Sequence, residues 1–213
     1  MIVPSMNSKE LIKEVFNDFV IVERKAFYLS ESLRRAAVKS KHKHIQKLFD
    51  YRSKRYNNWI ILVDSYVAMV VIRYAVWYLD EYGMNGLRVN SDLKYLTHLT
   101  PHFLDRYNER FLHQPALSKL ELLKKFTQNN PIEVLMSVPD ADENHNRIYG
   151  RFNDGIGLGY EEVFKDVEQE IGHFKTFISQ DMIKDGQKEM DSYLGENYNE
   201  FWNEVHKINY RRA

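Results

Sequence analysis

Residues 100–111 read TPHFLDRYNERF and predict a short helix with two distinct faces. Thr100 is a favourable N-cap residue, and Pro101 suits the first helical position, where a backbone amide hydrogen has no partner in any case. The helical period gathers apolar residues on one stripe and basic residues on another. The apolar stripe is Phe103, Leu104, Tyr107 and Phe111, and the other stripe is His102, Arg106 and Arg110. We expect the first stripe to pack on a sheet and the second to carry the chemistry.

The segments on both sides of this helix predict an antiparallel sheet. Ranges 57–63 and 66–79 are rich in β-branched and aromatic residues, with a turn at Asp64-Ser65 and another at 83–86. Ranges 87–89 and 93–99 add strand material before the helix, and 147–152, 156–160 and 172–179 add it after. In the last strand the alternation predicts Phe174, Thr176 and Ile178 on one face and His173 and Lys175 on the other. Between these groups, Ser118 caps a helix to residue 126, and 132–136 suit a helical turn.

Helical patterns predominate at both ends of the chain. From Asn7 or Ser8 to about residue 39 the apolar spacing predicts one long helix or two abutting ones, and a further helix is expected over 43–55. Helices are also expected from 179 or 181 to 194, and from 198 to 205. The sequence therefore predicts a single α+β domain, 1–213. It consists of a helical N-terminal portion, 1–55, and a core, 56–213, with an antiparallel sheet of four or more strands, a packed central helix and C-terminal helices.

Composition narrows the function classes. The 213 residues include 30 basic and 30 acidic side chains and no cysteine, so disulfides, thiolate nucleophiles and cysteine metal sites are excluded. The apolar window 59–78 is interrupted by Asp64, Ser65 and Arg73, and no N-terminal run resembles a signal peptide. We expect no membrane partner and a cytoplasmic location.

Charge is unevenly distributed along this neutral chain. Range 34–55 holds nine Lys or Arg against one acid, whereas 140–170 holds nine acids against three basic residues. The two stretches could be solvated faces, could pair with each other, or could mark a phosphate-binding surface. On the last interpretation the nucleic-acid-binding candidates are Arg34, Arg35, Lys39, Lys41, Lys43 and Lys47.

Familiar cofactor and metal motifs are not found. Residues 155–159 read GIGLG, which lacks the lysine and spacing of a phosphate-binding loop and is more typical of a bulge or of close backbone approach. His98 and His102 are four residues apart, but Pro101 separates them, so we assign them to different elements and expect no zinc site. We expect neither a cofactor nor a metal.

The basic stripe suits cleavage of an RNA phosphodiester. That reaction needs a proton acceptor at the 2'-hydroxyl, a proton donor at the leaving oxygen and cations on the phosphate, which one histidine and two arginines can supply. A mixed surface with weak ion pairs is the competing interpretation. The run from His102 to Arg110 resembles a helix of the barnase, EndoU, colicin and RelE-type superfold of toxin ribonucleases, and 155–159 and 175–178 are similar to its closing hairpin. The resemblance implies a metal-independent, toxin-like ribonuclease with His102, Arg106, Arg110, Lys175 and Thr176 at its site and RNA as substrate.

Two other functions stay open from the sequence. The N-terminal helices could form an interface with a protein partner or with a second copy of the chain, without catalysis. Alternatively, range 34–55 could bind nucleic acid without cleaving it.

Overall fold

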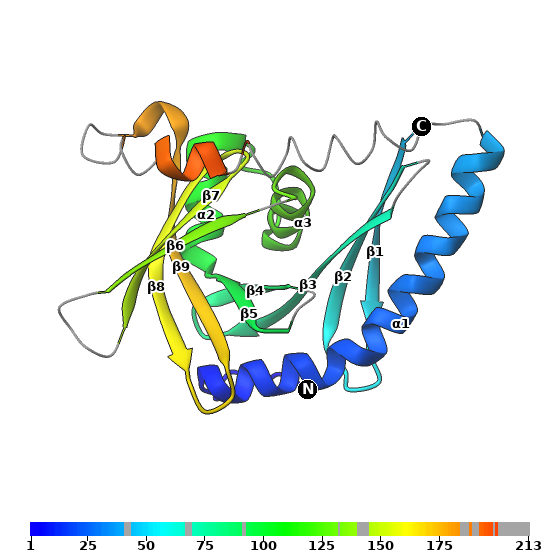
Figure 1. Ribbon diagram of the computed structural model, residues 1–213, viewed down its shortest axis with the longest axis horizontal. Coiled ribbons are helices and arrows are strands. Elements are labelled where there is room, and N and C mark those ends of the chain that lie inside the picture. The colour runs from blue at the N-terminus through cyan, green and yellow to red at the C-terminus, as the bar shows by residue number, and fades with distance from the viewer. Residues whose placement is uncertain are drawn as a thin grey trace.

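A nine-stranded sheet organises the described part of the chain (Figure 1). The computed structural model describes residues 1–40, 44–66, 70–90, 93–131, 133–139, 145–183, 188, 192–197 and 199. The helices and helical turns are α1 (Ser8–Ser40), α2 (Pro101–Tyr107), the π-helical turn η1 (Asn108–Leu112), α3 (Lys119–Asn129) and the 3₁₀ turn η2 (Gln180–Met182). The strands are β1 (His44–Arg52), β2 (Asn58–Tyr66), β3 (Val70–Asp80), β4 (Gly83–Val89), β5 (Tyr95–Leu99), β6 (Val134–Pro139), β7 (Asn146–Phe152), β8 (Gly155–Phe164) and β9 (Gln169–Ser179).

The sheet consists of two antiparallel meanders joined side by side. Its strand order is β1-β2-β3-β4-β5-β9-β8-β7-β6, and only the central β5–β9 pair is parallel. A parallel neighbour requires a crossover connection, which α2, α3 and the second meander provide between β5 and β9. The fold is therefore α+β with a mostly antiparallel sheet, as predicted, and the sheet is larger than the four or more strands expected from the sequence.

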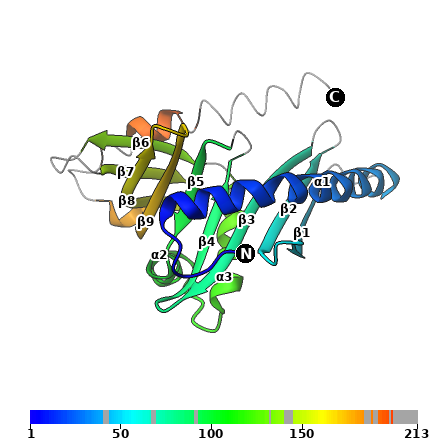
Figure 2. The ribbon, with the colours of Figure 1, turned by 90° about the horizontal axis from the view of Figure 1, so that it is seen from below.

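Alternating residues divide the core between the two faces of the sheet. On β2, Trp59 and Ile61 join one buried cluster with α1, whereas Ile60 joins a second cluster with Phe103 of α2 and Leu123 of α3. Helix α1 therefore covers one face, and α2 and α3 cover the other (Figures 1 and 2). We call these the α1 face and the α2–α3 face.

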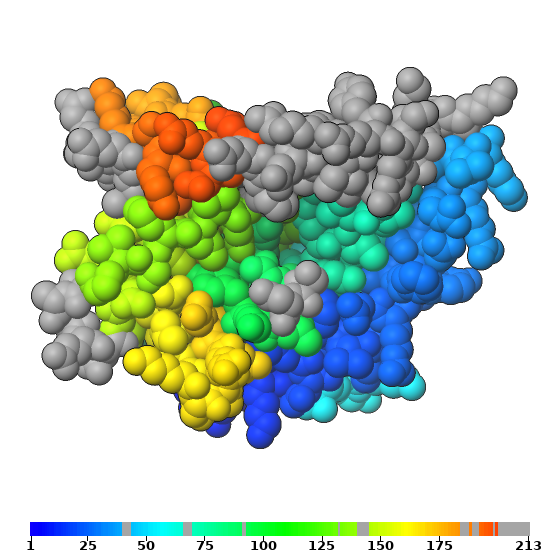
Figure 3. Space-filling model, viewed as in Figure 1, coloured from blue at the N-terminus to red at the C-terminus, as the bar shows by residue number. Residues whose placement is uncertain are grey.

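Buried polar groups fix α1 to the first meander. Asp18 is fully buried and accepts hydrogen bonds from Asn57 Nδ2 and Trp59 Nε1, each at 2.8 Å. Glu14 lies one turn earlier and binds Arg55, whose hydrogen bond lowers the pKa of Glu14 to about 2. The N-terminal end of α1 also reaches the second meander, where Lys9 pairs with Asp166 in the β8–β9 turn. Figure 3 shows this yellow turn beside the blue start of the chain.

The N-terminal predictions were correct up to residue 40 and wrong beyond it. One uninterrupted helix spans Ser8–Ser40, but the expected helix over 43–55 is strand β1. Ile45, Phe49 and Tyr51 fall on the α1 side of this strand, with Leu48 on the other side. This alternation of period two, paired with β2, prevails over the helical spacing of the same residues.

Corrections in the first meander concern its turns. The turn expected at Asp64-Ser65 lies inside β2, and the glycines at 83 and 86 lie inside β4, because the chain reverses at Asp80–Gly83 instead. Nevertheless, the β-structure expected from 57 to 99 is present. No helix in the described residues has the length and apolar composition needed to span a membrane.

The second meander also differs in detail from the prediction. The helical turn expected over 132–136 is largely strand β6. Ser118 caps α3, as predicted, and does so in a reciprocal capping box with Glu121. Residues 192–197 are helical, so the helix passes the end expected at 194, and the start expected at 179 or 181 is the 3₁₀ turn η2 instead. The final helix expected from 198 to 205 lies almost entirely outside the described residues.

The last strand contains a bulge that breaks the predicted alternation. Its register with β8 shifts between Leu158 and Gly159, so Phe174 and Phe177, three residues apart, both pack in the cluster on the α2–α3 face. The alternating glycines of β8 make room for these rings, since a Cβ on Gly157 would lie 2.6 Å from Phe174 Cδ1. A Cβ on Gly159 would lie 1.9 Å from the carbonyl oxygen of His173. The glycine pattern is therefore structural, as the sequence favoured.

Candidate functional site

Helix α2 is fixed against β9 by its N-cap residue, Thr100. The Thr100 hydroxyl accepts a hydrogen bond from the Phe103 amide at 3.2 Å and donates one to the Phe174 carbonyl at 2.9 Å. Phe103 and Tyr107 are fully buried, and the Tyr107 hydroxyl donates to Asp154 at 2.6 Å. The predicted cap and apolar stripe are therefore present, although Phe111 at the end of the stripe is 38% exposed.

The opposite face of α2 carries the predicted basic stripe. His102 is exposed, and its Nε2 atom accepts from Arg106 Nε at 3.4 Å. This contact assigns the neutral tautomer with the proton on Nδ1 to His102. The same guanidinium binds Glu109 Oε2 at 2.6 Å, so Arg106 is held between a neutral imidazole and a carboxylate.

Arg110 continues the stripe but turns towards the sheet. Its Nη1 atom donates to the Phe177 carbonyl at 2.5 Å and lies 3.5 Å from Thr176 Oγ1. The pairing of β5 with β9 ends at Leu99 and Phe174, so the β9 backbone beyond that point has a free edge on this side. Arg110 satisfies a carbonyl of that edge. We call His102, Arg106, Arg110 and Thr176 the His102 strip.

Lys175 does not belong to the His102 strip. It occupies the β9 bulge, and its Nζ atom lies 5.2 Å from the centre of the Tyr160 ring. That ring stacks on His173, which contacts Ser8 of α1. The structure thus places His102 against Arg106 and Arg110 against Thr176, as two separate contacting pairs, and places Lys175 on the α1 face.

The predicted nucleic-acid-binding residues are divided between two elements. Arg34, Arg35 and Lys39 lie in the last turns of α1, and Lys47 lies in β1. Arg34 pairs with Glu31 one turn away, and Lys47 Nζ lies 5.2 Å from the Phe49 ring centre. Lys41 and Lys43 lie outside the described residues.

Sequence reasoning missed a chain of buried polar groups on the α1 face. His98 of β5 and His173 of β9 are register partners, and their Nδ1 atoms are 2.7 Å apart. His98 Nε2 lies 2.9 Å from Asn85 Oδ1, and His173 Nε2 lies 3.2 Å from Glu162 Oε1. We call these four residues the histidine chain. Both imidazoles are buried, with 8% exposure for His98 and 5% for His173.

The contacts define which atoms in this chain carry protons. Asn85 Nδ2 donates to the Gly83 carbonyl, which leaves its Oδ1 atom to accept from His98 Nε2. His98 Nδ1 then accepts from His173 Nδ1. Burial, and secondarily the charges of His173 and Lys175, holds the pKa of His98 well below 6.5. The hydrogen bond from His173 lowers the pKa of Glu162.

This arrangement can transfer a proton between buried groups but has no local sequence signal. His98 and His173 are 75 residues apart and become neighbours only through the parallel pairing of β5 and β9. His98 and His102 do belong to different elements, as the sequence indicated. Among the described residues, no group of three or more His, Asp or Glu side chains is arranged to hold a metal ion.

No family model, curated protein or solved structure matches this chain.

Proposed function

We propose that the His102 strip binds and cleaves an RNA phosphodiester without a metal ion, as a toxin-like ribonuclease. The observation that carries this proposal is the contact between His102 and Arg106 on the exposed face of a firmly anchored helix. This contact supports the proposal because a group that can transfer a proton lies next to a cation that can bind phosphate, and both roles are needed in the reaction. Helix α2 also precedes a four-stranded meander whose last strand brings Thr176 to Arg110.

In this mechanism the neutral His102 removes the proton from the ribose 2'-hydroxyl through Nε2. The 2'-oxygen attacks phosphorus, the bond to the 5'-oxygen breaks, and the 5'-oxygen takes up the proton that His102 has removed, so the products are a 2',3'-cyclic phosphate and a free 5'-hydroxyl. Binding of the phosphate draws Arg106 away from His102 and frees the Nε2 lone pair. Arg110, already bound to the Phe177 carbonyl, positions the strip and Thr176. The histidine chain and Lys175 take no part.

The test is RNA cleavage by the full chain in the presence of a chelator. We expect a 2',3'-cyclic phosphate product and a loss of about 100-fold or more in rate for His102→Ala. The matched control is His113→Asn, because His113 is an exposed histidine just beyond η1, and asparagine tolerates its positive φ of 53°. Cleavage that survives in folded His102→Ala, or that needs a divalent metal, contradicts the mechanism.

A second candidate function is an interaction through α1. Phe27 and Tyr28 are 66% and 69% exposed, and Val38 is 62% exposed near the end of the helix. Large apolar side chains exposed on one helix are typical of a protein interface. If a second copy binds there, sedimentation will show a dimer that Phe27→Lys dissociates, whereas Tyr82→Lys, at an exposed hairpin position, leaves it intact. A monomer at all concentrations contradicts self-association.

A further inference from the structure

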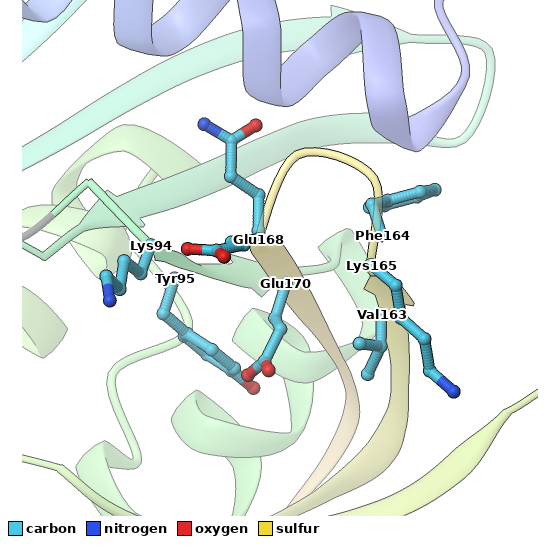
Figure 4. A pocket seen from close by; sticks show the side chains of 8 residues that line it. Lys94, Tyr95, Val163, Phe164, Lys165, Glu168 and Glu170 are labelled. Atoms are coloured by element: carbon cyan, nitrogen blue, oxygen red, sulfur yellow. The ribbon is translucent and has the colours of Figure 1, made fainter.

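The pocket between the start of β5 and the β8–β9 hairpin does not select a partner by charge. It has a volume of about 520 Å³, and its lining includes Lys94 and Lys165 as well as Glu168 and Glu170 (Figure 4). Two cations and two carboxylates leave no net charge for a ligand to balance. The open edge of the sheet at β1, by contrast, carries a pattern of side chains that favours one partner.

Strand β1 is an edge of the sheet along its whole length. Among the described residues its one strand neighbour is β2, with which it pairs without interruption from His44 to Arg52. Every second residue of an edge strand points its backbone N–H and C=O groups away from the sheet, where a further strand can bind them. The opposite edge, β6, is shorter and ends at Pro139, which lacks an N–H group. β1 contains no proline, glycine or bulge, so it is the edge better suited to bind another strand.

Apolar side chains lie along this open edge. Ile45, Phe49 and Tyr51 are on the α1 face and Leu48 is on the α2–α3 face, and all four are half-buried. A strand added beside β1 would cover more of each of them. Lys47 is exposed on the same strand, and an exposed lysine is a common guard against unspecific pairing of edge strands. A specific partner strand must therefore place something other than a second lysine opposite Lys47.

The sequence of β1 meets this condition when the strand pairs with a copy of itself. In an antiparallel pair with a two-fold axis at Leu48, residues equally distant from Leu48 face each other. On the α1 face, Lys47 then lies opposite Phe49 of the second copy, where the ring attracts its ammonium group, and Ile45 lies opposite Tyr51. Lys47 Nζ already lies 5.2 Å from the centre of the Phe49 ring within one chain.

The other face of the same pair is also complementary. Leu48 meets Leu48 of the second copy at the axis, and the amide of Gln46 faces the carboxylate of Asp50. At the two ends His44 faces Arg52, and both side chains are exposed to water. An axis at Lys47 or at Asp50 would instead bring two like charges together. The side chains of β1 therefore favour the axis at Leu48.

We propose that β1 binds β1 of a second copy of this chain, antiparallel and with the two-fold axis at Leu48, so that the two nine-stranded sheets become continuous. Helix α1 runs past β1 at this end of the molecule (Figure 2), and the two α1 helices lie on the same side of the joined sheet. This contact is independent of the proposed ribonuclease activity. It also uses a different surface from the exposed side chains of α1, so the two contacts can be tested separately.

The first experiment is disulfide cross-linking of the full chain, which contains no cysteine of its own. Leu48→Cys places two thiols directly opposite each other, within the Cα separation that a disulfide bridges. Gln46→Cys and Asp50→Cys are matched controls on the same face of the strand, but each lies about 14 Å from its own copy, four residues along the strand. Under mild oxidation we expect Leu48→Cys to form a covalent dimer about tenfold or more faster than either control.

The second experiment is sedimentation of the full chain, which we expect to show a dimer. Leu48→Lys brings two ammonium groups together at the axis and is expected to weaken dimerisation about tenfold or more. The matched control Gln46→Lys adds the same charge to the same face but meets Asp50 of the second copy. Its dimer is expected to be within about threefold of the wild type, or tighter. Thermal unfolding shows whether both variants are folded.

Three results would overturn the proposal. The first is a folded wild-type protein that sediments as a monomer at every concentration. The second is cross-linking of Leu48→Cys no faster than that of Gln46→Cys and Asp50→Cys, which means that the strands do not meet at this axis. The third is a dimer that Phe27→Lys dissociates and folded Leu48→Lys leaves intact, which identifies α1 as the interface instead of β1.

Discussion

The His102 strip and the histidine chain use the same residue types in opposite environments. His102 is exposed on α2 and contacts the long side chain of Arg106. His98 is buried between strands and contacts Asn85 and His173. In the His102 strip, water can stabilise a charged side chain, so its side chains can exchange contacts with water for contacts with a ligand. In the chain, each polar atom depends on its protein neighbour. The difference teaches that exposure suits the strip to binding and catalysis, whereas the chain contributes chiefly to stability.

The largest expected effect comes from removing the support beneath the strip. Phe103 is fully buried, and its ring lies within 5.2 to 6.1 Å, centre to centre, of four other phenylalanine rings. Phe103→Ala should lower the free energy of unfolding by about 3–5 kcal/mol, because it leaves a cavity among these rings. Its neighbour His102→Ala, on the exposed face, should change it by no more than about 0.5 kcal/mol. Urea denaturation of both variants measures this difference. Equal losses of unfolding free energy would show that the buried and exposed faces of α2 contribute equally to stability.

The sequence was sufficient for this helix because its signals are local. Thr100, Pro101 and the spacing of Phe103 and Tyr107 all act within two turns, and Ser118 with Glu121 does the same for α3. The alternation in 44–52 was local too, but it was hidden by apolar residues at 45, 48 and 49 that also suit a helix. Only pairing with β2 decides between the two periods.

The histidine chain and the β9 bulge could not be predicted from local patterns. Both depend on β9 lying between β5 and β8, which is a property of the strand order and not of any short segment. The bulge at Lys175 then separates this residue from Thr176, although the two are adjacent in sequence. Local patterns therefore predicted the helix that carries the His102 strip, whereas the histidine chain follows from the strand order alone.

The second effect is on the histidine chain itself. His98→Ala leaves Asn85 Oδ1 and His173 Nδ1 without their partner in a buried site, and each such loss costs about 1–3 kcal/mol. We expect a total loss of about 2–6 kcal/mol in the free energy of unfolding. A loss below about 1 kcal/mol, measured by denaturation at neutral pH, would mean that water replaces the imidazole and that the chain contributes little.

The pH dependence of the same variant sharpens the contrast. Because the folded protein lowers the pKa of His98 below 6.5, the unfolded chain binds the proton first as pH falls. Stability is therefore unaffected above about pH 6.5 and decreases below it, by at most about 1.4 kcal/mol per pH unit for this group. His98→Ala should flatten this decrease between about pH 6.5 and 5, whereas His102→Ala should retain it. The lowered pKa of Glu162 adds a loss only below about pH 4.5, outside this window.

The smallest expected effect separates the two arginines of the strip. Arg110 donates to the Phe177 carbonyl at the free edge of β9, whereas the polar contacts of Arg106 among the described residues are with His102 and Glu109 of its own helix. Arg110→Ala should therefore cost about 1 kcal/mol of unfolding free energy, and Arg106→Ala no more than about 0.5 kcal/mol, as for an exposed ion pair.

For RNA binding the Arg106 substitution should have the larger effect and the Arg110 substitution the smaller one. Arg106 is proposed to bind phosphate directly, whereas Arg110 positions the strip. Arg106→Lys keeps the charge but not the bidentate geometry, so RNA affinity or cleavage should decrease although stability does not. In Arg110→Lys, stability should decrease more than binding. Denaturation and RNA titration on the same four variants provide both readings. If Arg110→Ala is as stable as the wild type, its bond to β9 adds no stability, and Arg110 is then free to bind phosphate as Arg106 does.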